Sequence, residues 1–208
     1  MREDTKTITF AAVVCVTCSL LLSGTAAGLK NRQDANEAFD VKRNIVKAFG
    51  TDISAMARPE IEATFEKHVS GKTVEGLPLF TWTDEGSDKP SKYAFPISGK
   101  GLWSMLYGYL SLDADLETIA GISFYKHGET PGLGAEIEKD WFLSQFAGKR
   151  IYADGVPTEF TVAKPGTAQG ESAVDGISGA TLTGKGVEAL LRKDAAAYAN
   201  YFNSIKGN

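Results

Sequence analysis

The chain opens with a long uncharged segment. Positions 7–29 carry no Asp, Glu, Lys or Arg, and nearly all of them are apolar or small. At a helical rise of about 1.5 Å per residue, such a segment matches a hydrocarbon core of about 30 Å. The pattern predicts a membrane anchor over residues 1–29. A cleaved signal peptide is the alternative, with Thr-Ala-Ala at 25–27 as its cleavage site, although the segment is longer than a usual signal-peptide core.

Helical periodicity follows the anchor. Apolar residues spaced three and four positions apart predict an amphipathic helix over 34–49, with Gly50 as its terminator. A weaker helical pattern covers 58–68. Gly, Pro, Asp and Ser are then concentrated over 71–91, which predicts a turn-rich connection.

Aromatic and β-branched residues in short segments bounded by Gly, Asp and Pro predict the strands. Three strands are expected over 93–98, 106–112 and 119–126, and two shorter ones over 149–151 and 158–164. One helix is expected over 136–146, and the last helix is expected to begin after Gly186. The apolar face of that last helix consists of Val187, Leu190, Leu191, Tyr198, Tyr201, Phe202 and Ile205. The result is an α+β fold: a transmembrane helix followed by one domain, residues 30–208, with a mainly antiparallel sheet and packed helices.

Composition limits the classes of function. Of the 208 residues, 43% are hydrophobic and 10% aromatic, which is enough for a packed core. The net charge is −4 and there is no dense basic run, so the electrostatic footprint of a nucleic-acid-binding protein is missing. Cys15 and Cys18 lie in the anchor, where we interpret them as packing residues. The folded domain therefore has no disulfide framework, and we predict no metal site in it.

The strongest candidate for chemistry is the segment 175–184, Asp-Gly-Ile-Ser-Gly-Ala-Thr-Leu-Thr-Gly, just ahead of the last predicted helix. Its small residues let a ligand approach the backbone closely. Hydroxyl groups and amides at a helix N-terminus suit a phosphate. The alternative is an ordinary loop with an N-cap.

Within this segment, Asp175-x-x-Ser178-Gly179-Ala180-Thr181 resembles the flavinylation motif recognised by bacterial flavin transferases. The resemblance implies that Thr181 carries FMN through a phosphoester bond, installed from FAD by a separate Mg-dependent transferase. Thr183 is a competing hydroxyl outside the motif. Contacts with the flavin are expected from Ser178, Gly179, Ala180, Leu182 and Thr183.

Two further segments are similar to flavin-binding signatures. Residues 127–134, His-Gly-Glu-Thr-Pro-Gly-Leu-Gly, resemble a loop that lines the flavin pocket in FMN-binding subunits of two related respiratory complexes, and 99–103, Gly-Lys-Gly-Leu-Trp, resemble a segment beside it. The resemblance implies flavin contacts from Glu129, Thr130, Gly132 and Leu133. Trp103 either stacks on the flavin ring or is a core tryptophan. Lys164 is either a cation near the flavin or an ordinary surface lysine.

Together these segments resemble the NqrC family, the FMN-binding subunits of the Na+-translocating NADH:quinone oxidoreductase. The related RnfG subunit of the Rnf electron-transport complex is the alternative, although Arg32-Gln33 and Asn44-Ile45 favour NqrC. The resemblance implies a single-pass protein of the bacterial inner membrane with a periplasmic domain. Its FMN would relay single electrons between redox centres of neighbouring membrane subunits, with no complete activity in this chain alone.

The sequence also bears on other functions. No Gly-x-Gly-x-x-Gly turn follows a predicted strand, so we expect NADH to be oxidised on another subunit. An alternative of another class is a membrane-anchored or secreted binding module that holds no cofactor.

Overall fold

The computed structural model describes residues 2–206. It divides into two compact units, residues 1–40 and residues 41–208. The first unit is helical, and the second contains a sheet with helices packed on both faces, which confirms the α+β fold.

One helix, α1 (Arg2–Ala48), contains the whole apolar segment. The helix expected over 34–49 is confirmed as far as Ala48. It continues the anchor without a break, because residues 30–37 contain neither Gly nor Pro. By length and composition, α1 can cross a membrane, and the side chains of its apolar window are exposed in the isolated chain.

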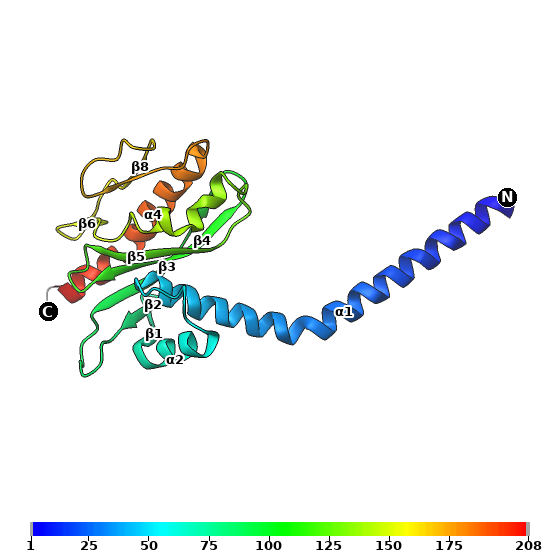
Figure 1. Ribbon diagram of the computed structural model, residues 1–208, viewed down its shortest axis with the longest axis horizontal. Coiled ribbons are helices and arrows are strands. Elements are labelled where there is room, and N and C mark those ends of the chain that lie inside the picture. Colours follow the sequence, from blue (N-terminus) through cyan, green and yellow to red (C-terminus); the bar gives the residue numbers. More distant parts are fainter. Residues whose placement is uncertain (1, 207–208) are drawn as a thin grey trace. The chain divides into compact units, whose positions relative to one another are not determined.

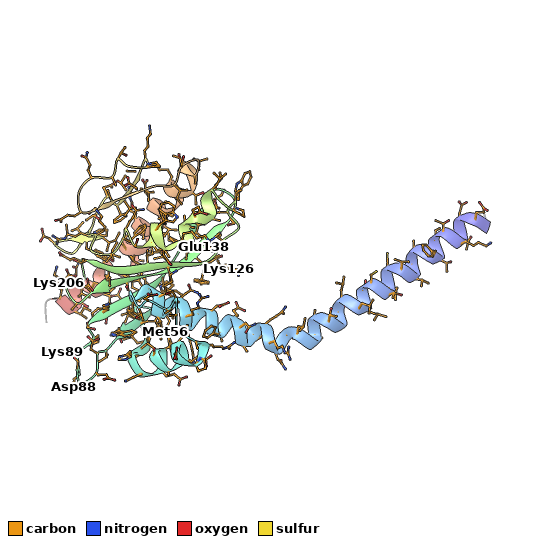
Figure 2. The ribbon with its side chains drawn as sticks, viewed as in Figure 1. Met56, Asp88, Lys89, Lys126, Glu138 and Lys206 are labelled. Carbon is orange, nitrogen blue, oxygen red and sulfur yellow. The ribbon has the colours of Figure 1, made fainter. Side chains whose placement is uncertain are left out.

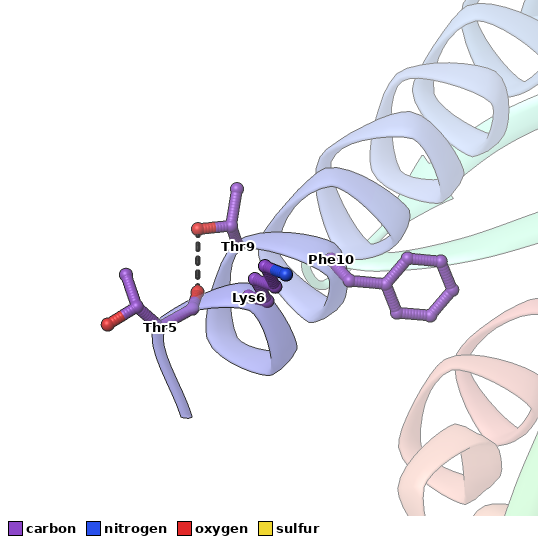
Figure 3. Close-up of a pocket in the computed structure, with 4 residues that line it drawn as sticks. All are labelled: Thr5, Lys6, Thr9 and Phe10. Carbon is purple, nitrogen blue, oxygen red and sulfur yellow. Dashed lines mark hydrogen bonds between the residues drawn. The ribbon is translucent and has the colours of Figure 1, made fainter. Parts of the chain in front are cut away.

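The threonine hydroxyl groups of the apolar segment are hydrogen-bonded within the helix. Thr9 donates to the carbonyl of Thr5 at 2.8 Å, at the exposed turn drawn in Figure 3. The same bond to the carbonyl four residues earlier is made by Thr7, Thr17 and Thr25. Because hydrocarbon offers no hydrogen-bond partners, these internal bonds make the polar side chains compatible with a membrane interior.

The domain is built on a five-stranded antiparallel sheet in the order β1-β2-β3-β4-β5. Its strands are β1 (Val69–Val74), β2 (Leu77–Trp82), β3 (Lys92–Lys100), β4 (Met105–Asp113) and β5 (Ile119–Lys126). The three strands predicted over 93–126 are confirmed as β3 to β5. Helix α2 (Arg58–His68) is confirmed at its predicted bounds.

Successive residues of β3 and β4 point to opposite faces, and each face has an apolar cluster. Phe95 and Leu110 belong to the larger cluster, which the sheet shares with α4 (Thr181–Lys206). Ala94 and Tyr109 belong to the smaller cluster with Phe49, just beyond the end of α1. Figure 1 shows α4 on one side of the sheet and the end of α1 with α2 on the other. Both faces of the sheet are therefore buried.

The prediction of a turn-rich connection over 71–91 is only partly correct. Its first half forms the β1–β2 hairpin, which turns at Glu75 and Gly76, both with positive φ. Residues 70–73 of β1 are all exposed, so this edge strand shows no apolar alternation. The strand forms because β2 pairs with it, and a pattern search along one segment does not detect such a partner.

Three boundaries in the second half of the chain also differ. The helix expected over 136–146 is a short 3-10 helix η1 (Gly134–Glu138) and one turn α3 (Asp140–Leu143), because Lys139 is extended with ψ 144°. Residues 149–151 form no strand, and of 158–164 only β8 (Thr161–Ala163) does. The remaining strands are β6 (Tyr152–Ala153), β7 (Val156–Pro157) and β9 (Ala173–Asp175), which pairs parallel to β8.

The start of the last helix is the correction that matters for function. Helix α4 begins at Thr181 and not after Gly186. Both Gly184 and Gly186 are buried within it, because the helix packs closely against β8 and the β3–β4 hairpin at these positions. The predicted apolar face is confirmed, since its residues are buried or partly buried in the larger cluster.

The far end of α4 is held by a buried carboxylate. Glu117 is 7% exposed and accepts hydrogen bonds from Arg150 and Lys206 (Figure 2 labels Lys206). The hydrogen bond from Lys206, and then that from Arg150, hold the pKa of Glu117 below its ordinary value. The ionised carboxylate therefore stabilises the folded chain.

We expect the stabilising effect of Glu117 to disappear in acid. A carboxyl with a lowered pKa in the folded state contributes stability above its unfolded pKa, and this contribution is lost as the pH falls through the folded pKa. Glu117→Gln should therefore lower the free energy of unfolding at pH 7, and the difference from wild type should shrink towards pH 3. Urea unfolding of both proteins at several pH values measures this difference, and a gap independent of pH would contradict it.

Candidate functional site

The hydroxyl of Thr181 is presented at the start of α4. Thr181 is exposed, and its hydroxyl makes no hydrogen bond within residues 2–206. The amide of Gly184 donates to the carbonyl of Ala180 at 3.0 Å, so Ala180 is the N-cap residue. N-caps are usually Ser, Thr, Asp or Asn, whose side chains bond the first free amides. Alanine cannot do so, which leaves the amides of the first turn available to a ligand.

The loop before Thr181 is tightly bent. The amide of Ala180 donates to the carbonyl of Ile177 at 3.1 Å, and Gly179 has φ 75°, which favours glycine. A Cβ at Gly179 would also lie 2.9 Å from Cδ2 of Leu133. Ser178 and Gly179 are exposed, whereas Ala180 is 3% exposed. The 127–134 loop therefore lies directly against the predicted flavinylation motif.

Asp175 of the motif has a local structural role. Its Oδ1 accepts hydrogen bonds of 2.8 Å from the amides of Thr167 and Ala168. The backbone amide of Asp175 donates to Oε1 of Gln145 at 2.9 Å, and Nε2 of Gln145 donates to the carbonyl of Asp175 at 3.2 Å. These bonds hold the strand that leads into the loop. Lys164, just after β8, is exposed, and its predicted contact with a flavin stays a prediction.

The tryptophan of the 99–103 segment is not a core residue. Trp103 is 71% exposed, so that interpretation was wrong. Leu102, Leu133 and Leu182 are also exposed, by 38%, 42% and 61%. Exposure of several large apolar side chains on segments that meet at one place is typical of a ligand or partner site. The surface around Thr181 therefore suits a flat apolar ring.

Thr130 and Gly132 shape the loop between β5 and η1. The carbonyl of Thr130 accepts hydrogen bonds of 3.1 Å from the amides of Leu133 and Ala135, and Gly132 has φ 73°. His127 precedes this turn, and its Nδ1 lies 3.4 Å from the amide of Glu129. The turn directs Leu133 outward, where it is exposed.

Glu129 lies beneath the exposed residues and is 6% exposed. Its Oε1 accepts hydrogen bonds from the amides of Trp103 and Ser104 at 3.0 and 3.2 Å, and its Oε2 accepts one from the hydroxyl of Thr183 at 2.7 Å. Burial acts to raise the pKa of this carboxyl, but the bonds from Thr183 and the 102–104 backbone outweigh it and hold the pKa below its ordinary value. The carboxylate is therefore ionised and bonded to protein groups.

Thr181 and Thr183 differ sharply in access. Thr183 is 1% exposed and its hydroxyl donates to Glu129, whereas Thr181 is exposed. A helix beginning at Thr181 places these residues about 200° apart around the axis, at 3.6 residues per turn, so one faces the solvent and the other the sheet. In the sequence the two hydroxyls differ only in their place relative to the motif, because both were expected in a loop ahead of the last helix.

Comparison with known proteins identifies the domain. Residues 101–195 match the model of the FMN-binding domain family. The NqrC subunit of the Na(+)-translocating NADH-quinone reductase of Vibrio campbellii is 31% identical over 89% of this chain and 88% of that protein. The same subunit of Pseudomonas aeruginosa is 32% identical over 91% and 90%. This chain belongs to the NqrC family.

Solved structures agree with this assignment. The crystal structure of the corresponding Na(+)-translocating NADH-quinone reductase subunit from Parabacteroides distasonis has a TM-score of 0.73 and 33% identity, covering 84% of this chain and 96% of that one. Shewanella oneidensis NqrC gives the same TM-score at 26% identity, covering 84% and 100%. The resemblance to NqrC is thereby confirmed. The chain is a membrane-anchored member of this family with an FMN-binding domain and a role in electron transfer.

Proposed function

We propose that this chain carries FMN covalently, through a phosphoester to Oγ1 of Thr181, and relays single electrons between redox centres of neighbouring membrane subunits. The observation that carries the proposal is the exposed Thr181 hydroxyl, free of hydrogen bonds within residues 2–206, beside the uncapped amides at the start of α4. The matching FMN-binding domain supports the choice of ligand.

Maturation requires a flavin transferase to reach the acceptor hydroxyl. Thr181 Oγ1 forms the new bond to the FMN phosphorus of FAD, the diphosphate bond of FAD breaks, AMP leaves, and the hydroxyl proton is released. Because Thr183 is buried, we expect that the transferase does not modify it. The exposed loop at Ser178 and Gly179 gives the transferase access to Thr181.

The first turn of α4 suits a bound phosphodiester. The phosphate carries a negative charge, and a negative charge near a helix N-terminus is stabilised by about 0.3–1 kcal/mol. Ala180 supplies no competing side chain, so amides of the first turn are available as donors. The phosphate would therefore lie against the helix end, with the flavin ring beyond it.

The exposed apolar side chains are expected to hold the ring. FMN supplies one-electron chemistry when bound. Trp103 would stack on it, and Leu133 and Leu182 would exclude water from its edges. Lys164 would place positive charge near the ring and stabilise added negative charge. Thr130 and Gly132 would contact it through the backbone of their turn.

The partners follow from the family. The relatives are named as one subunit of a Na(+)-translocating NADH-quinone reductase, so we propose that other membrane subunits of such a complex supply and accept the electrons. The domain would face the periplasm with α1 as its membrane anchor. NADH oxidation, quinone reduction and Na+ transport would belong to the assembled complex and not to this chain alone.

Mass spectrometry after co-expression tests the proposal. The full chain is co-expressed with an active flavin transferase, purified in detergent and digested. We expect the peptide that contains Thr181 to be heavier by the mass of one FMN less one water. Fragmentation of that peptide should place the added mass on Thr181. A chain without flavin, from cells in which a control substrate is modified, would contradict the proposal and favour the cofactor-free binding module. A flavin on Thr183 would contradict the assigned site.

A further inference from the structure

The carboxylate of Glu129 joins two separate parts of the candidate site. One oxygen accepts from the amides of Trp103 and Ser104 in the β3–β4 turn. The other accepts from the hydroxyl of Thr183 in the first turn of α4. Residue 129 itself lies on a third segment, the loop after β5. Three segments distant in sequence therefore meet at one buried charge.

Close-fitting glycines leave room for this charge. A Cβ at Gly101 would lie 2.6 Å from Oε1 of Glu129, and a Cβ at Gly134 would lie 2.7 Å from Oε2. The Gly134 Cβ would also lie 2.6 Å from Oγ1 of Thr183. Side chains at these positions would displace the carboxylate. The backbone at Gly101 and at Gly134 therefore packs closely against the two carboxylate oxygens of Glu129.

The bonds of Glu129 hold the backbone of the turn that carries the exposed Trp103 ring. Trp103 is 71% exposed, so its side chain has little packing to hold it. Its backbone is held instead by a charge-assisted bond, which is stronger than one between neutral groups. The same carboxylate is bonded to α4 two residues beyond Thr181. Glu129 thus connects the Trp103 turn to the first turn of α4, in addition to the packing of Gly186 against the hairpin.

We infer that Glu129 is a positioning residue, whose carboxylate fixes the Trp103 turn against the first turn of α4 and so holds the Trp103 ring over the flavin on Thr181. The inference rests on the proposed function. It differs from the sequence prediction that Glu129 contacts the flavin, because both oxygens of Glu129 bond protein groups. If Glu129 had a purely structural role, its substitution would change the stability of the domain and leave the flavin properties unchanged.

The test uses the full chain, co-expressed with a flavin transferase and purified in detergent. Thr183→Val removes the bond to α4 and leaves the bonds of Glu129 to the turn. Glu129→Gln keeps the shape and weakens the bonds by removing the charge, and Trp103→Leu removes the ring. Fluorescence on a denaturing gel reports attachment, and flavin fluorescence in the native protein reports quenching by Trp103. A redox titration followed by flavin absorbance measures the midpoint potential.

We expect Thr183→Val and Glu129→Gln to keep covalent flavin but to lose Trp103 quenching, so that native fluorescence rises towards that of Trp103→Leu. The double variant Trp103→Leu with Thr183→Val should not exceed Trp103→Leu alone. Native fluorescence and midpoint potential equal to wild type in both single variants would overturn the inference. Wild type without flavin on the denaturing gel would instead refute the proposed function.

Discussion

Thr181→Ala is expected to remove all covalently bound flavin from the chain. The phosphoester needs a hydroxyl at this position, and alanine has none. The Thr181 side chain is exposed and makes no hydrogen bond within residues 2–206, so its loss should change the free energy of unfolding by no more than about 0.5 kcal/mol. A complete loss of flavin without a loss of stability separates this position from a structural one.

Two matched variants sharpen this prediction. Thr181→Ser keeps a hydroxyl on the same Cβ and should retain flavin. Thr183→Val removes the neighbouring hydroxyl, which is buried, and should also retain it. Fluorescence of the three proteins on one denaturing gel, after co-expression with the transferase, gives the comparison. Fluorescence in Thr181→Ala equal to wild type would show that another residue carries the flavin.

Gly186→Ala is expected to destabilise the domain although the residue lies inside a helix. Alanine in a helix interior is ordinarily favoured over glycine by about 1 kcal/mol. Here a Cβ would lie 2.5 Å from the carbonyl oxygen of Lys100 and 3.0 Å from Cα of Gly101, both backbone atoms. Helix α4 would have to move away from the β3–β4 hairpin. Overpacking of this kind costs about 1–3 kcal/mol, which exceeds the gain.

Gly184→Ala is the matched control, two residues earlier in the same helix. Its Cβ would lie 3.1 Å from Cγ1 of Val162, a side-chain atom, so a displacement of only a few tenths of an ångström would relieve the contact. We expect a smaller loss of stability than for Gly186→Ala. Urea unfolding of the full chain in detergent, followed by tryptophan fluorescence, measures both. A Gly186→Ala protein as stable as wild type would show that the hairpin can move freely.

Much of the architecture was predictable because the signals are local. The apolar length of α1, the helical period over 58–68 and the β-branched and aromatic residues of β3 to β5 each act within one segment. The β1–β2 hairpin was not predictable in this way, because β1 is polar on its exposed residues and is held by its neighbour. The helix expected over 136–146 was broken at Lys139, whose backbone is extended.

The sequence alone determined the apolar anchor, the α+β class and the motif that ends at Thr181, because each depends on residues close together in the chain. Only the tertiary structure decided which hydroxyl is accessible, since the start of α4 at Thr181 turns Thr183 inward against Glu129. It also decided that Trp103 is exposed and that Glu129 is bonded to the β3–β4 turn. These properties depend on contacts between segments far apart in sequence, and such contacts exist only after the sheet and α4 have packed.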